Sequence, residues 1–344
     1  MHITRLELEN YTVFAKNSFE FEPGVNIFIG ENGTGKTHVM KILYSACQAV
    51  DAKVSFANKL VRTMLPDDYK ISRLLTRKPG NHTAEVKVYA RTEKAEVDKT
   101  LSLTFSNKTK KWDAEEHGTE SWERAFKGIS SIFIPAKEIL SNSYNLAAAV
   151  DKGNVKFDDT YIDVVNSAKI DISAGRNSDE KNRRLSRIEK IIGGSVTYNG
   201  KNDEFYLKKG QSKQEFTLVA EGIRKMALLW QLVKNGTLEQ GSVLFWDEPE
   251  ANINPTYIEI IVELLLELSR HGVQIFLATH DYMLAKYFEV RRTSKDKIRF
   301  HSFKCDNQGV VEYTQGSTFG DLKNNLIIES FNKLLDEIYA LEDM

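Results

Sequence analysis

The chain has 344 residues, of which 41% are hydrophobic and 28% charged, enough apolar material for a core in one large domain or two modest ones. The formal net charge of -1 gives no overall attraction to nucleic acid or membranes, although a local basic patch stays compatible with it. Two cysteines are too few for a disulfide framework. No apolar run reaches the roughly 18 residues of a membrane span, and the first residues lack the apolar segment of a signal peptide. We therefore expect a cytoplasmic protein with reduced thiols and no membrane contact.

The strongest motif is the segment 30–37, GENGTGKT, which matches the pattern G-x-x-x-x-G-K-[ST] in full. An apolar run at 25–29, typical of a buried strand, precedes it, and apolar residues at helical spacing follow it. Glycines let a backbone wrap around phosphate oxygens, and the free N–H groups of a helix N-terminus point at them. The context favours a nucleotide site over a simple glycine turn. The predicted nucleotide contacts are Asn32, Gly33, Thr34, Gly35, Lys36, Thr37 and His38.

Within this loop, Lys36 would place a positive charge at the β- and γ-phosphates, and the Thr37 hydroxyl would ligate Mg²⁺. A second apolar run, 242–246, leads directly into Asp247 and Glu248. A carboxylate at the carboxyl end of a central strand is where a P-loop enzyme holds its Mg²⁺, and Asp247 fits that role. Glu248 is placed to polarise the attacking water as general base. Two exposed acids at a strand end are the alternative, which the phosphate loop disfavours.

A helix and a further strand follow the two acids. Asn254 is a suitable N-cap, Pro255 suits the first helical position, and Gly272 is typical of a helix end. The strand predicted at 273–279 ends at His280, which could reach the γ-phosphate and respond to its loss. An isolated histidine would more often be an ordinary surface residue, and its position at this strand end favours the functional role.

Together these residues resemble the ABC-type ATPase family, in the branch that includes RecF-like, chromosome-maintenance and OLD-like proteins. The matched positions are Lys36 and Thr37 for Walker A, Asp247 and Glu248 for Walker B, and His280 for the switch histidine. The stretch 247–255 is similar to the DEPE…LHP stretch of OLD-like members, with Asn254 where the family usually has His or Asp. The resemblance implies ATP and Mg²⁺ as cofactors. It also implies an α/β P-loop NTPase fold, an ABC-ATPase head with a mixed sheet flanked by helices and an inserted helical lobe.

The signature helix of the family precedes Walker B, and the candidate here begins in the stretch 218–225. Glu221 stands where the family usually has Ser, directly before Gly222. A carboxylate aimed at a γ-phosphate is repulsive, so either Glu221 turns away or the contact uses backbone N–H groups. An ordinary amphipathic helix is the alternative. The resemblance also implies a Q-loop after the strand 131–135, where Glu138 would replace glutamine as a contact to Mg²⁺ or water.

The middle of the chain carries weaker signals. Residues from about 84 to 105 alternate like paired strands, and Asn199-Gly200 predicts a hairpin. A basic cluster is interpreted first as a solvated helix face and second as a contact to phosphate backbone. Its members are Lys181, Arg183, Arg184, Arg187 and Lys190. We expect one discontinuous ATPase domain over 1–344, with its core at 1–140 and 195–344 and a helical insertion at 141–194.

The resemblance implies that ATP bound to one subunit is completed by the signature helix of its mate, in a homodimer or a higher even oligomer. Two functions remain open. The first is a switch subunit that gates a partner effector, such as a nuclease, in prokaryotic antiviral defence. The second is a RecF-like DNA-repair ATPase that clamps nucleic acid directly. A transporter subunit is a distant third because the signature motif is altered. The scattered histidines and carboxylates give no second metal site, so nuclease chemistry is not expected in this chain.

Overall fold

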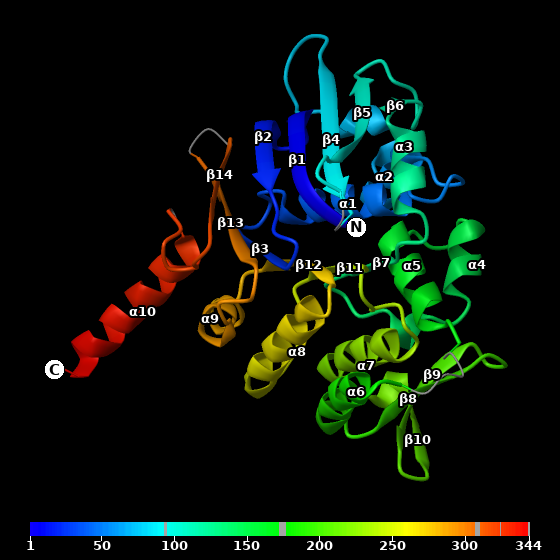
Figure 1. Cartoon of the computed structure of the whole chain (residues 1–344), viewed down its shortest axis with the longest axis vertical. Helices are drawn as coiled ribbons and strands as arrows, with labels where there is room; N and C mark the ends of the chain where they lie inside the picture. Colours follow the sequence, from blue (N-terminus) through cyan, green and yellow to red (C-terminus); the bar gives the residue numbers. More distant parts are fainter. Residues whose placement is uncertain (93–94, 172–176, 307–309, 324, 343–344) are drawn as a thin grey trace.

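The computed structural model describes residues 1–92, 95–171, 177–306, 310–323 and 325–342. Its centre is a six-stranded mixed sheet in the order β14-β13-β3-β12-β11-β7 (Figure 1). These strands are β3 (Val25–Gly30), β7 (Ser131–Ile134), β11 (Val243–Asp247), β12 (Gln274–Thr279), β13 (Ile298–Cys305) and β14 (Val311–Gly316). All neighbours pair in parallel except β13 and β14. The expected α/β fold with a mixed sheet is therefore confirmed.

A five-stranded antiparallel sheet lies beyond one face of the central sheet, with helices between the two (Figure 1). Its strands are β1 (His2–Tyr11), β2 (Phe14–Glu20), β4 (Thr83–Arg91), β5 (Lys99–Ser106) and β6 (Glu115–His117). The helices on this side are α1 (Lys36–Gln48), α2 (Phe56–Met64) and α3 (Thr119–Phe126). The strand pair expected within 84–105 is thus confirmed as β4–β5, and β1 and β2 form a second antiparallel pair.

Helices and a small sheet cover the other face. The helices are α4 (Leu146–Asp151), α5 (Asp159–Ala168), α6 (Asp179–Ile192), α7 (Glu221–Lys234), α8 (Ile258–Arg270) and α9 (Tyr282–Arg291). The small antiparallel sheet consists of β8 (Ser195–Asn199), β9 (Glu204–Lys209) and β10 (Ser212–Glu215). The predicted hairpin at Asn199-Gly200 is confirmed as β8–β9. The division of the domain at 141 and 194 stays a prediction.

The central strands are buried on both faces, so their side chains alternate between two hydrophobic cores. In β3, Ile27 and Ile29 belong to the core shared with α5 to α9, whereas Phe28 belongs to the core shared with α1, α2 and the five-stranded sheet. Packing on both faces fixes the ends of the central strands in position. The carboxyl ends of β3, β11 and β12 therefore form one rigid edge, which carries the predicted site.

The helix that follows the phosphate loop, α1, is itself deeply buried. Its Cys47 is 1% exposed, and burial raises the pKa of this thiol well above its usual range. The other cysteine, Cys305, is partly exposed at the end of β13. Both thiols are free.

The basic cluster on α6 is not a uniformly solvated helix face, which corrects the first interpretation. Arg184 is only 7% exposed and belongs to the buried side of the helix. Arg187 pairs with Glu263 and Glu267 of α8, and Lys181 pairs with Glu239 at 2.9 Å. These charges are therefore largely used to attach α6 to its neighbours.

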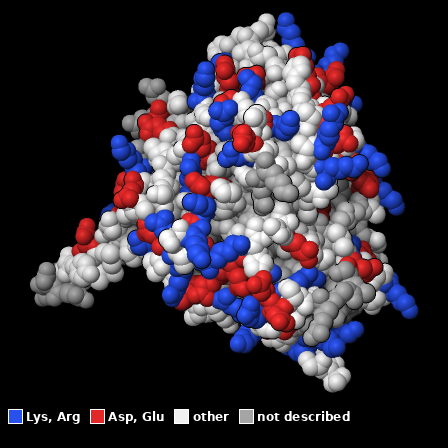
Figure 2. Space-filling model, in the orientation of Figure 1, with Lys and Arg blue, Asp and Glu red and all other residues white. Residues whose placement is uncertain are grey.

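The helix α10 (Leu326–Glu342) extends away from the body of the molecule (Figure 1). Near its start Phe331 stacks on Tyr282 of α9, with ring centroids 4.0 Å apart. Farther along, its apolar side chains Leu334, Ile338 and Leu341 are exposed. In the part of the chain that the structure describes, no helix is both long and apolar enough to cross a bilayer. Basic and acidic side chains intermingle on the face shown in Figure 2, in keeping with the small net charge.

Candidate active site

The phosphate loop joins the end of β3 to the start of α1. Its backbone favours glycine at three positions, because Gly30, Gly33 and Gly35 have φ angles of 138°, 80° and 93°. A Cβ on Gly30 would lie 2.0 Å from the carbonyl oxygen of Phe303, so this glycine also allows β3 to approach β13. Thr34 is buried and donates to the Glu31 carbonyl at 2.8 Å. The predicted contacts Asn32 and Gly33 are exposed at the tip of the loop.

Lys36 lies folded over this loop. Its Nζ donates to the carbonyl oxygens of Gly30 at 2.9 Å and Glu31 at 2.7 Å. Burial lowers the pKa of Lys36 to about 8, against the opposing effect of the nearby Asp247 and Glu248 carboxylates. The ammonium group is therefore held at the loop by neutral acceptors that a phosphate could replace.

Thr37 and Asp247 meet across 210 residues of sequence, because α1 begins and β11 ends at the same edge of the sheet. The Thr37 hydroxyl donates to Oδ2 of Asp247 at 3.0 Å. Burial is the largest influence on the Asp247 carboxyl and raises its pKa, while the bond from Thr37 acts in the opposite direction. A hydroxyl and a buried carboxylate, both hard oxygen donors, suit Mg²⁺, which would also relieve the cost of burying this charge.

Glu248 and His280 face each other beside this pair. Nε2 of His280 is 4.0 Å from Oε1 of Glu248, and the two residues follow neighbouring strands β11 and β12. The backbone of Glu248 is left-handed, with φ 48°, a conformation that costs a non-glycine residue about 1–2 kcal/mol. Such strain is typical of residues held for function. Burial and the nearby Lys36 lower the pKa of His280, which favours its neutral imidazole form.

Glu250 is a partly buried acid behind these residues, and the sequence analysis gave it no role. Its Oε1 accepts from the Thr279 hydroxyl at 2.6 Å and from the His280 N–H at 3.3 Å. Its Oε2 is buried and without a hydrogen-bond partner among the described residues. Burial raises the pKa of Glu250 to about 7. The side chain thus connects the loop after β11 to the end of β12.

Lys225 of α7 is a second residue that the sequence analysis left without a role. It is 1% exposed, and its Nζ donates to the Ala251 carbonyl at 3.0 Å and to the Glu248 carbonyl at 3.4 Å. Burial lowers its pKa. Lys225 therefore fixes the loop that carries Glu248 to the helix that carries Glu221 and Gly222.

The predicted signature residues, Glu221 and Gly222, are the first two residues of α7. Neither Glu221 nor Gly222 shares a hydrogen bond with the phosphate loop among the described contacts. Gly222 packs instead on the loop after β11, where a Cβ would lie 2.3 Å from the Asn252 carbonyl oxygen. Within the chain, a close approach of two backbones thus explains the glycine.

Glu138, the candidate Q-loop residue, is occupied by internal contacts. Its carboxylate accepts from Nε of Arg224 at 2.6 Å and from the Ser141 hydroxyl at 2.8 Å. The side chain is only 2% exposed. It therefore connects the segment after β7 to α7, and a contact to Mg²⁺ or to the attacking water would require these bonds to open.

Two cavities flank the phosphate loop. The larger, of about 940 Å³, is lined by His38 and by residues that include Thr12, Arg73, Arg77 and Lys78. Nδ1 of His38 lies 3.2 Å from the Thr12 hydroxyl, and burial lowers the pKa of this histidine to about 4. His38 therefore lines a hollow beside the loop as a neutral side chain. The hollow is large enough for the base and sugar of a nucleotide.

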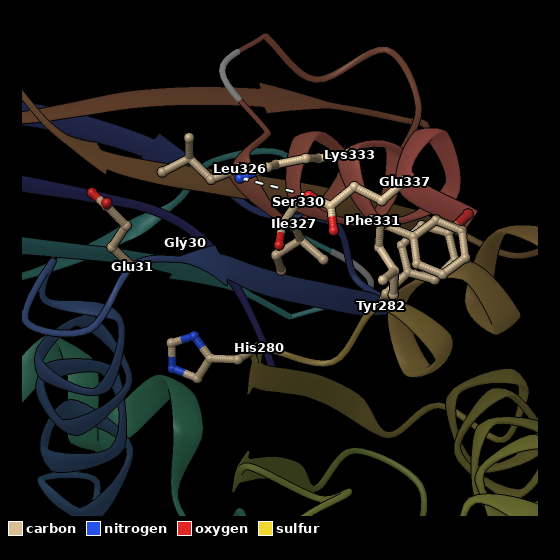
Figure 3. A pocket seen from close by; sticks show the side chains of 11 residues that line it. Gly30, Glu31, His280, Tyr282, Leu326, Ile327, Ser330, Phe331, Lys333 and Glu337 are labelled. Carbon is tan, nitrogen blue, oxygen red and sulfur yellow. Dashed lines mark ion pairs between the residues drawn. The ribbon is translucent and has the colours of Figure 1, made fainter. Parts of the chain in front are cut away.

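The second cavity, of about 620 Å³, separates the loop from α10. Figure 3 shows Glu31 and His280 at one end of it and the stacked pair Tyr282 and Phe331 at the other. Leu334 also lines this cavity. One wall of the space beside His280 thus comes from the projecting helix.

The phosphate loop after β3, the carboxylate at the end of β11 and the histidine at the end of β12 resemble the nucleotide site of P-loop ATPases of the ABC type, among them RecF and the chromosome-maintenance heads. The chain belongs to the family described as "AAA domain, putative AbiEii toxin, Type IV TA system", whose model matches residues 25–285. Solved structures that share the fold include the SMC head domain from Thermotoga maritima, with 16% identity and a TM-score of 0.53, covering 91% of this chain and 98% of that one. They also include the SmcHead bound to the C-winged helix domain of ScpA, with 14% identity and a TM-score of 0.58, covering 93% of this chain and 99% of that one.

Among curated proteins the chain resembles the DNA replication and repair protein RecF. The protein from Lysinibacillus sphaericus is 30% identical over 99 residues, which cover 28% of this chain and 26% of the relative. The protein from Geobacillus thermodenitrificans is 32% identical over 111 residues, which cover 32% of this chain and 25% of the relative. The matched segments thus span only about a quarter of these relatives.

Proposed function

We propose that this chain is an ATP-hydrolysing switch subunit that dimerises around ATP and gates a partner effector in a prokaryotic defence system. The observation that carries the ATPase part is the convergence of Thr37, Asp247, Glu248 and His280 on the phosphate loop. These four side chains come from three strand ends of one sheet edge. Lys36 adds a positive charge for the phosphates. Thr37 and Asp247 supply two metal ligands, Glu248 supplies a base, and His280 supplies a hydrogen-bond donor or acceptor.

Binding would begin with the exchange of partners at Lys36. Its ammonium group leaves the Gly30 and Glu31 carbonyls for phosphate oxygens, and the N–H groups at the start of α1 bind the same phosphates. Thr37 and Asp247 would hold Mg²⁺, and the chemistry that this ion would supply is the neutralisation of phosphate charge. The base and sugar occupy the cavity beside His38.

Hydrolysis would use Glu248 as the base. Its carboxylate takes a proton from a water molecule as the water oxygen bonds to the γ-phosphorus, and the bond from that phosphorus to the bridging oxygen of ADP breaks. His280, whose neutral form is favoured by burial and by Lys36, orients Glu248 or the γ-phosphate without competing for the proton. Glu250 and Lys225 hold the two loops that carry this pair.

Dimerisation would complete the site. Glu221 and Gly222 open α7 and share no described hydrogen bond with the phosphate loop of their own chain, so we propose that they serve the loop of a second copy. The repulsion expected from Glu221 favours a contact through the N–H groups at the start of α7. Hydrolysis would then release the second copy and provide the two states of a switch.

Effector chemistry would come from another protein. Among the residues that the structure describes, no group of three or more His, Cys, Asp or Glu side chains could hold a metal ion. The family description names a putative toxin system, which favours a role in defence. The alternative, a RecF-like repair ATPase that clamps nucleic acid, is favoured by the similarity to RecF. ATPase activity stimulated by DNA in the pure chain would select the alternative, and activity that requires a co-purifying protein would select the switch.

The test of the ATPase is the variant Glu248→Gln, which keeps size and hydrogen bonding but removes the base. We expect ATP affinity to be retained and turnover to fall by about 10²–10⁴-fold. Glu329→Gln on the exposed part of α10 is the matched control and should leave turnover unchanged. Turnover near the normal rate in Glu248→Gln, measured as phosphate release, would assign the base to another residue.

A further inference from the structure

A separate cavity lies at the opposite edge of the central sheet from the phosphate loop. It has a volume of about 360 Å³, within the usual range for small-molecule sites. It lies between the start of α6, the ends of α7 and α8, and the segment before β11. Its lining is partly apolar, through Val233, Leu238, Leu268 and Val273.

Arg184 is the unusual member of this lining. It is 93% buried, since its exposed fraction is 7%, and its Nε and Nη1 have no hydrogen-bond partner among the described residues. A guanidinium group is always charged and carries five N–H donors, so burial without an acceptor is unfavourable. An anion in the cavity would supply the missing countercharge to this guanidinium group.

The other charges around the cavity are already paired. Lys181 donates to Glu239 at 2.9 Å, and His271 is bonded to Glu180. Glu239 is the one acid in the lining itself, and its side chain is 61% exposed. Arg184 therefore remains as the uncompensated charge, and Glu239 is the internal group that could compete with an anion for it.

The start of α6 adds a smaller contribution. Ser178 caps this helix by accepting from the Lys181 N–H, and Asn177 and Ser178 both line the cavity. Two acids in the first turn, Asp179 and Glu180, offset the positive end of the helix dipole. The buried guanidinium is thus the main attraction, and the polar groups near it add hydrogen bonds.

We propose that this cavity binds a small organic anion, with a carboxylate or phosphate group on Arg184 and an apolar body against Val233, Leu238 and Leu268. The site lies next to Val273, at the start of β12, whereas the proposed ATP site lies at the end of that strand. It also touches the end of α7, whose first residues are Glu221 and Gly222. A ligand here would therefore bind independently of the phosphate loop and contact the far end of the same helix.

The test is calorimetric titration of the full chain with benzoate, phenyl phosphate and inorganic phosphate, and with neutral benzyl alcohol as a reference. We expect benzoate or phenyl phosphate to bind, with at least a tenfold loss of affinity in Arg184→Gln. The two ring probes distinguish a carboxylate ligand from a phosphate ester. Arg183→Gln, on the exposed side of α6, is the matched control and should bind normally.

Glu239→Gln is the complementary variant, because removal of the competing acid should tighten binding of the anionic probes. ATP binding, measured on each variant, reports whether the fold is intact and is expected to be unchanged. Absence of binding by every anionic probe, equal binding of benzyl alcohol, or equal weakening by Arg183→Gln would each overturn the proposal. None of these outcomes depends on whether the chain hydrolyses ATP.

Discussion

Lys36 is held by two carbonyl oxygens at the loop, and its pKa of about 8 lies within reach of ordinary assay conditions. A bound triphosphate would favour the charged ammonium and raise this pKa. Binding near pH 8 should therefore take up about half a proton per site, and uptake should fall towards zero near pH 6. Calorimetry in buffers of different ionisation enthalpy measures this uptake. Equal proton uptake at pH 6 and pH 8 in the unmodified chain would contradict this role of Lys36. The variant Lys36→Ala should lose most of the ATP affinity.

Glu250 makes the stability of the protein depend on pH in a defined direction. Its pKa of about 7 in the folded state lies above the ordinary glutamate value of 4.5. Between these values the folded protein holds a proton that the unfolded chain releases, so the free energy of unfolding falls as the pH rises through this window. Above pH 7 the loss reaches about 3 kcal/mol at most.

Glu250→Gln should remove this dependence and stabilise the protein at about pH 8 relative to the unmodified chain. Urea unfolding at about pH 5 and about pH 8 provides the measurement. Glu329→Gln, on the exposed part of α10, is the control and should follow the unmodified protein. Parallel curves for Glu250→Gln and the unmodified chain would show that the buried carboxyl is already ionised.

For single residues, the sequence predicts those whose roles come from local motifs. Lys36 and Thr37 follow from the loop pattern, and Asp247 from its place at a strand end. Glu250 and Lys225 could not be predicted in the same way. Their roles depend on contacts with Thr279 and with the carbonyls of Glu248 and Ala251, which no spacing within the sequence specifies.

Among the elements, α7 and the loop after β11 are coupled through Lys225. Lys225→Met would keep the length of the side chain and leave two carbonyl oxygens without their donor. We expect a loss of about 1–3 kcal/mol in the free energy of unfolding and a lower rate of ATP hydrolysis, because Glu248 is less well held. Lys234→Met, in the last turn of the same helix, is the control. Unchanged hydrolysis in a measurably destabilised Lys225→Met would limit this contact to a structural role.

The strands β3, β11 and β12 were predicted well, since continuous apolar runs are typical of strands that are buried on both faces. In the helix α6 the basic residues led to the wrong prediction of a solvated face. Arg184 shares the helical face of Ile188 and Ile191, at spacings of four and seven residues, and this face packs into the core. The spacing alone would have indicated a buried arginine, but the surrounding basic residues favoured a solvated face.

For the whole molecule, the proposed role of Glu221 and Gly222 at the phosphate loop of a second copy leads to a prediction about assembly. Glu248→Gln with ATP and Mg²⁺ should accumulate as a dimer, because the site closes and hydrolysis cannot reopen it. Light scattering after size exclusion measures the mass, and the same variant with ADP should show less dimer. A mass that does not respond to ATP would contradict a nucleotide-closed dimer even if ATP hydrolysis is demonstrated.

The reactivity of the Cys47 thiol can report local opening around α1. The thiol lies inside the helix that begins at Lys36, with 1% exposure, whereas Cys305 is partly exposed. A thiol reagent would modify Cys305 directly but could reach Cys47 only when α1 separates from its sheet. The modification rate of Cys47 relative to that of Cys305 therefore reports how often α1, which begins at the phosphate loop, separates from its sheet. A ligand that binds this loop tightly should lower the modification rate of Cys47.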